Sequence, residues 1–146
     1  MTTECIEDQL REEYCRFRAK RGKKNIFKEV PVFSRSVDLV EFDAHSRKIT
    51  AVEFKVSDWK RAIKQLLEVA ACFDYLVLCY PKPKTEECRN NIRSRCDELG
   101  IGLLLWDKNS GLFLCECKPA SVFTIWKVQK KRVISYICNF KENGYE

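Results

Sequence analysis

The segment from Tyr75 to Tyr80 is short and wholly apolar, and it constrains the fold more than any other feature of the chain. Pro81 and Pro83 follow it and end it, because proline cannot donate the backbone hydrogen bond that a central strand needs. A stretch with apolar residues at helical spacing precedes it. A continuous apolar strand after a helix is typical of a sheet that is covered on both faces. The segment therefore predicts a layered α/β fold.

The rest of the chain supplies further elements. Apolar residues at three- and four-residue steps predict helices, and runs rich in β-branched and aromatic residues predict strands. In chain order we expect a helix over 4–19, strands Val30–Phe42 and Lys48–Val56, a helix capped by Ser57 or Asp58, the strand Tyr75–Tyr80, a helix from Thr85 to Leu99, and strands Ile101–Trp106 and Leu112–Cys117. The segment 121–140 suits a strand or a helix, and its length favours a helix. This order predicts an α/β sandwich with a mixed central sheet flanked by helices.

The length of 146 residues suits a single domain over 1–146, with a core over about 4–118 and a basic C-terminal extension over 119–146. No apolar run approaches the roughly 20 residues that cross a bilayer, so no membrane association is expected. The nine cysteines are an odd number, and no segment resembles an export signal. We therefore expect reduced thiols in a cytoplasmic protein.

The basic residues are unevenly placed. The net charge is +6, and eight Lys or Arg residues fall between Arg11 and Lys28. A second basic cluster near the C-terminus holds Lys127, Lys130, Lys131 and Arg132. A surface that faces a polyanion would need such clusters, although a solvated helix face also accounts for them.

Two acids and one lysine form the most informative pattern. Asp38 lies within the apolar segment Val37–Val40, while Glu53 and Lys55 share one face of the next strand because side chains alternate. Phosphodiester hydrolysis needs a hard cation, and Mg²⁺ prefers oxygen ligands from one or two carboxylates. Asp38, Glu53 and the backbone carbonyl of Phe54 are the expected metal ligands. Lys55 would orient the attacking water and stabilise charge on the phosphate.

A Glu-x-Lys spacing also arises by chance in charged proteins, where it is usually a solvated pair. The pattern gains weight from an acid in the preceding apolar strand and from a helix that carries Gln65 directly afterwards.

These residues resemble the PD-(D/E)XK nuclease superfamily, which includes archaeal Holliday-junction resolvases, many restriction enzymes and small repair or defence nucleases. The resemblance runs from Glu7 to about Trp106, although Val37 stands where the motif's name has proline. The segments that carry it are Val37–Val40, Ile49–Val56, Phe73–Leu78 and Gly100–Leu105. It implies a restriction-endonuclease-like αβββαβ core.

The resemblance also implies roles for particular residues. Asp38 and Glu53 match the metal-binding acids and Lys55 the catalytic lysine. Gln65 matches a helix position that in many members points a polar side chain at the site, and it could equally be a surface glutamine. Glu7 resembles an acid that some members add as a further metal ligand. Its close alternatives are Glu4, Asp8 and Glu12.

The expected function is hydrolysis of DNA phosphodiester bonds by a Mg²⁺-dependent or Mn²⁺-dependent nuclease, an endonuclease of repair, recombination or defence. A homodimer is expected by resemblance to the resolvases. The expected nucleic-acid contacts are Arg35, Lys60, Arg61, Lys64, Lys127, Lys130 and Lys131. One alternative is a non-catalytic nucleic-acid-binding module on the same fold. Another is an interaction subunit whose basic faces meet an acidic protein.

Overall fold

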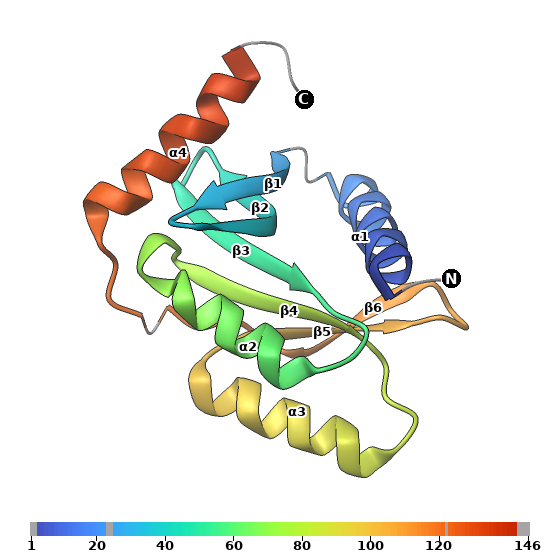
Figure 1. Cartoon of the computed structure of the whole chain (residues 1–146). Helices are drawn as coiled ribbons and strands as arrows, with labels where there is room; N and C mark the ends of the chain where they lie inside the picture. Colours follow the sequence, from blue (N-terminus) through green and yellow to red (C-terminus); the bar gives the residue numbers. More distant parts are fainter. Residues whose placement is uncertain (1–2, 23–24, 122, 143–146) are drawn as a thin grey trace.

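The computed structural model describes residues 3–22, 25–121 and 123–142. Six strands in this part of the chain form one mixed sheet, in the order β1-β2-β3-β4-β5-β6, and helices lie against both of its faces (Figure 1). The elements are α1 (Thr3–Lys20), β1 (Ile26–Val32), β2 (Arg35–Asp43), β3 (Lys48–Phe54), α2 (Trp59–Glu68), the 3₁₀ turn η1 (Ala70–Cys72), β4 (Tyr75–Pro81), α3 (Glu86–Leu99), β5 (Gly102–Asp107), β6 (Leu112–Cys117) and α4 (Lys127–Glu142).

The sheet combines two kinds of strand pairing. β1, β2 and β3 form an antiparallel meander, whereas β3, β4 and β5 run parallel. β6 returns antiparallel beside β5. Parallel neighbours need long crossover connections, which α2 and α3 provide. The predicted mixed α/β sheet is therefore confirmed.

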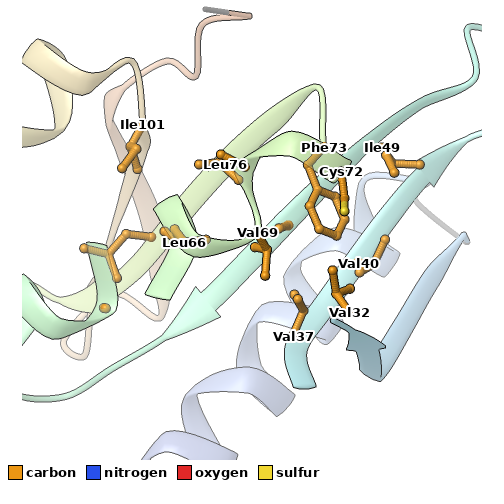
Figure 2. Close-up of a cluster of buried hydrophobic side chains, with 14 of the residues drawn as sticks. Val32, Val37, Val40, Ile49, Leu66, Val69, Cys72, Phe73, Leu76 and Ile101 are labelled. Carbon is orange, nitrogen blue, oxygen red and sulfur yellow. The ribbon is translucent and has the colours of Figure 1, made fainter. Parts of the chain in front are cut away.

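Two hydrophobic clusters lie on opposite faces of the sheet. The larger one joins the sheet to α2, α3 and α4, and Figure 2 shows part of it around Leu66, Val69 and Phe73. The smaller one joins α1 to the sheet through Leu10 and Tyr14. The segment 119–146, expected as an extension, contributes buried residues of α4 to the larger cluster, namely Val133, Ile134 and Ile137.

The predicted helix caps at Asp58, Thr85 and Gly100 are confirmed. The Thr85 side chain accepts a hydrogen bond from the backbone N–H of Cys88 at 3.2 Å, which caps the start of α3. Gly100 follows α3 with a φ of 76°, a left-handed conformation that glycine adopts without steric cost. Asp58 caps α2 by accepting from the backbone N–H of Arg61. The segment 121–140, for which a helix was favoured, contains most of α4.

One strand prediction was wrong. The segment Val30–Phe42 was expected to be one strand, but it contains the end of β1, a tight turn and most of β2. Phe33 occupies the turn with a φ of 56°, and Val32 pairs directly with Arg35. Two-residue hairpin turns usually show Gly or Asn at such a position. Phe33 and Ser34 carry no such signal, so the reversal was missed.

The remaining expectations concern thiols and membranes. The eight cysteines whose side chains the structure describes are free, and the side chain of Cys5 lies outside this set. Within the same part of the chain, no helix has both the length and the apolar character that a bilayer crossing demands.

Candidate functional site

Asp38 on β2 and Glu53 on β3 lie opposite each other on neighbouring antiparallel strands. The ladder pairs Leu39 with Val52, and the next position in the same register is Asp38 beside Glu53. Asp38 Oδ2 accepts a hydrogen bond of 2.9 Å from the backbone N–H of Phe54, and Glu53 Oε1 lies 3.5 Å from the backbone nitrogen of Asp38. The structure therefore brings together the two acids that the sequence places on separate strands.

These contacts mark the point at which β2 and β3 separate. The ladder ends at Leu39 and Val52. Beyond it, the backbone N–H groups of Asp38 and Phe54 bond to carboxylate oxygens rather than to backbone carbonyls. Buried backbone donors need a partner, so the acids also complete the end of the ladder.

Glu53 is buried beside a like charge. Glu53 is 6% exposed, and Asp38 is half-buried. Burial raises the pKa of Glu53, and the charge of Asp38 and the hydrogen bond with its side chain raise it further, to about 8. The hydrogen bond with the Asp38 backbone and the charge of Lys55 act in the opposite direction. When one of two adjacent carboxylates is buried, ionising both of them is unfavourable. A cation placed between them would stabilise the ionised pair.

Lys55 and Glu7 extend the cluster towards α1. Glu7 Oε1 lies 4.0 Å from Lys55 Nζ, and Glu7 Oε2 accepts a hydrogen bond of 3.4 Å from the backbone N–H of Val56. The side chains of Lys55 and Glu7 are 23% and 21% exposed, so both lie at the edge of the interior. Of the alternatives considered for this acid, Asp8 pairs with Arg11 and Glu12 with Lys28, whereas the side chain of Glu4 lies outside the described residues.

A hollow of about 280 Å³ opens beside these residues. Its lining consists of Glu7, Asp8, Arg11, Glu29, Ser36, Asp38 and Phe54. Arg11, Glu29 and Ser36 were not among the predicted site residues. Arg11 could have been found, because it lies one helical turn after Glu7 on the same face of α1. Glu29 and Ser36 reach the hollow through the missed β1–β2 hairpin, so no local sequence signal marks them.

Gln65 is not joined to this cluster. It lies half-buried on α2, and within the described residues it makes no hydrogen bond with Asp38, Glu53 or Lys55. Its predicted role at the site therefore has no contact to support it.

The predicted nucleic-acid contacts fall into two groups. Lys60, Arg61 and Lys64 are exposed on α2, which begins four residues after Lys55. Arg35 forms an ion pair with Glu68 near the end of the same helix. This group therefore lies on α2 or against it, on the helix that follows Lys55 in the chain.

The second group lies on α4, where Lys127 and Lys131 are exposed. Lys130 instead pairs with the buried Asp74 at 2.8 Å, and Asp74 accepts a hydrogen bond from the backbone N–H of Ile49, near the start of β3. Ile49 and Glu53 are four residues apart, or roughly 13 Å along a strand. The α4 cations therefore lie near the other end of β3 from the acids.

Two carboxylates are the donors that the site offers to a hard divalent cation. They belong to Asp38 and Glu53, whereas the Phe54 backbone group that contacts Asp38 is its N–H and not the carbonyl that was predicted as a metal ligand. In the described residues, no group of three or more His, Cys, Asp or Glu is placed to hold a metal ion. Water and substrate oxygens would therefore complete the coordination, as is usual for Mg²⁺.

Comparisons with protein-family models, with curated proteins and with solved structures find no match to this chain. The juxtaposed acids Asp38 and Glu53, with Lys55 and Glu7 beside them, are therefore the main basis for assigning a function.

Proposed function

We propose that the chain is a divalent-metal-dependent nuclease that hydrolyses DNA phosphodiester bonds as an endonuclease, with a fold of the PD-(D/E)XK class. The observation that carries this proposal is the placement of Asp38 and Glu53 side by side where β2 and β3 separate, with Lys55 directly after the last residue of β3.

The order of elements supports the same proposal. From α1 to β4 the chain runs α, β, β, β, α, β, which is the order of the core that the family resemblance implies. The acids lie on the second and third strands of this series and the lysine follows the third. The helix that precedes the strands contributes Glu7, in the place where some members add an acid.

Each side chain has a distinct chemical task. A divalent cation bound by Asp38 and Glu53 would neutralise the phosphate and lower the pKa of a water molecule. Lys55 donates hydrogen bonds to the attacking water and to the phosphate oxygens as charge builds on them. Glu7 holds the Lys55 ammonium by charge at 4.0 Å and fixes the backbone of Val56. Lys60, Arg61 and Lys64 contact phosphates on either side of the cut.

The test uses the purified chain with circular, linear, single-stranded and branched DNA, and with RNA, in Mg²⁺ or Mn²⁺. We expect cleavage of DNA that includes closed circles, because an endonuclease needs no free end. Asp38→Asn, Glu53→Gln and Lys55→Ala should each lower the rate by about a hundredfold to a thousandfold, the scale for losing one group that stabilises developing charge.

Two control variants separate loss of chemistry from loss of structure. Asp74→Asn removes the other buried acid of the sheet, and Lys48→Ala removes a lysine from the opposite end of β3. Both should keep the wild-type rate per folded molecule. Metal-dependent cleavage that survives in Glu53→Gln and Lys55→Ala would show that another site, or a contaminant, is responsible. DNA binding without cleavage under every condition would instead support the non-catalytic module.

A further inference from the structure

Arg11 lines the same hollow as Asp38. Its side chain is 16% exposed, and its guanidinium pairs with Glu29 and, at 3.3 Å, with Asp8. Of the described residues that line the hollow, Arg11 is the one cation, whereas Glu7, Asp8, Glu29 and Asp38 are acids. A phosphate that approached this hollow would meet four carboxylates, so Arg11 has an electrostatic role there that no other lining residue can fill.

One donor of Arg11 has no partner. Its Nε is buried and makes no hydrogen bond in the described part of the chain. Burial lowers the pKa of Arg11, but the hydrogen bond with Glu29 and the charges of Glu29, Asp8 and Asp38 outweigh this and raise it. The guanidinium therefore stays charged, and its buried Nε keeps an unused donor. Arginine presents its N–H groups as a planar fork that matches two oxygens of a phosphate.

The present partner of Arg11 is held in an unusual way. Glu29 lies in the strand β1 with a φ of 51°, a left-handed conformation that is uncommon for a residue with a side chain. It is absent from the ladder that pairs Lys28 with Leu39 and Val30 with Val37. Its carboxylate accepts hydrogen bonds from Arg11 and from Ser36 Oγ, yet it is 57% exposed. Glu29 is therefore an accessible carboxylate that occupies the guanidinium from the solvent side.

We propose that Arg11 forms a phosphate-binding subsite beside Asp38, and that a phosphate group of the nucleic acid replaces the Glu29 carboxylate on its guanidinium. This inference rests on the proposed nuclease function. The exchange substitutes one anion for another, so Arg11 stays neutralised with or without nucleic acid. Glu29 thus competes with the substrate, and its removal should favour substrate binding.

The test measures DNA binding to the full chain in Ca²⁺, so that binding is followed without turnover, across a range of salt concentrations. Arg11→Gln should weaken binding about tenfold and reduce the slope of log K against log[salt] by about one, the value for one lost phosphate contact. Arg11→Lys should recover part of the affinity because it keeps the charge and loses the fork. Glu29→Gln should tighten binding severalfold.

Arg16→Gln is the matched control, because Arg16 lies on the same helix and pairs with Glu13 at 2.5 Å in the same i, i+3 arrangement, but its side chain is 63% exposed. It should change neither the affinity nor the salt slope by a comparable amount. A purely structural role for Arg11 predicts that Glu29→Gln lowers the melting temperature without tightening binding. That result overturns the inference even if Arg11→Gln fails to fold.

The two proposals fail differently. Wild-type protein that binds and cleaves DNA, together with an unchanged salt slope in folded Arg11→Gln or Arg11→Lys, would reject the subsite and leave the nuclease in place. Wild-type protein that neither binds nor cleaves DNA would reject both.

Discussion

Glu53 and Asp74 are the two buried charged side chains of the described residues, and they lie near opposite ends of β3. Glu53 is the second-last residue of that strand, while Asp74 accepts a hydrogen bond of 2.9 Å from the backbone N–H of Ile49 near its start. The residues are similarly buried, at 6% and 4% exposure. The charged groups beside the two carboxylates are opposite in sign.

Asp74 is neutralised by its neighbours. Lys130 Nζ lies 2.8 Å from its carboxylate and Lys48 Nζ lies 3.9 Å from it. Glu53 instead faces the carboxylate of Asp38, and burial with this like charge raises its pKa to about 8. The sheet therefore contains one acid that holds the fold together and one whose burial opposes folding. An acid of the second kind is typical of a functional site, since such sites trade stability for activity.

The largest expected effect is at the paired acid. Asp74→Asn removes the negative charge that pairs with Lys130. It should lower the free energy of unfolding by about 3 kcal/mol, the scale for removing one partner of a buried ion pair. Urea unfolding measures this, with the exposed Asp97→Asn on α3 as the control. A loss no larger than that of the control would mean that Asp74 is not a structural acid and would remove the contrast with Glu53.

The second effect is a gain of stability at the unpaired acid. The pKa of Glu53 is raised from 4.5 to about 8 in the folded protein. The folded state therefore binds a proton that the unfolded state releases, so wild-type stability falls as the pH rises from 4.5 through 8. Glu53→Gln is neutral at every pH and escapes this loss. It should be more stable than the wild type by about 2 kcal/mol at pH 9, with little difference at pH 5.

Urea unfolding of both proteins at pH 5, 7 and 9 without divalent ions measures this trend. If Glu53→Gln is destabilising by the same amount at all three values, the acid is paired in a way that its contacts do not reveal.

Much of the fold followed from local patterns. The apolar strand Tyr75–Tyr80 predicted a sheet buried on both faces, and Leu76, Leu78 and Cys79 are fully buried. Thr85 and Gly100 marked the ends of α3 because caps act within a single helical turn. The β1–β2 hairpin was missed because Phe33 adopts its positive φ with none of the residue types that favour it.

The site was only partly readable from the sequence. Alternation along one strand puts Glu53 and Lys55 on a common face, and this needs no knowledge of the fold. The pairing of Asp38 with Glu53 depends on the register of two strands, which tertiary packing sets. Arg11 and Glu29 are 18 residues apart in the sequence and lie on different elements, so no local signal reports that they meet.

The third effect comes from divalent cations and should distinguish the two acids directly. If Asp38 and Glu53 bind the ion, Mg²⁺ or Mn²⁺ at ten times its dissociation constant should stabilise the wild type by about 1.4 kcal/mol. Thermal unfolding with and without the ion measures this. Asp38→Asn should abolish the gain, whereas Asp74→Asn should retain it in full. An equal gain in all three proteins would place the cation elsewhere.

The smallest expected effect tests whether the neutralisation of Asp74 depends on proximity and burial. Lys130 lies 2.8 Å from Asp74 with its side chain 20% exposed, whereas Lys48 lies 3.9 Å away with its side chain 48% exposed. Solvent screens the second pair, so Lys48→Met should lower the free energy of unfolding by no more than about 0.5 kcal/mol. High salt should reduce even this difference.

Lys130→Met should lower the free energy of unfolding several times more, and this loss should depend less on salt. Removing Lys130 leaves the more distant Lys48 ammonium as the cation that faces the buried Asp74 carboxylate. If the two lysine variants lose equal free energy of unfolding in urea, water reaches the Asp74 carboxylate. The contrast with Glu53 would then reflect solvent access rather than the charge of the neighbouring side chain.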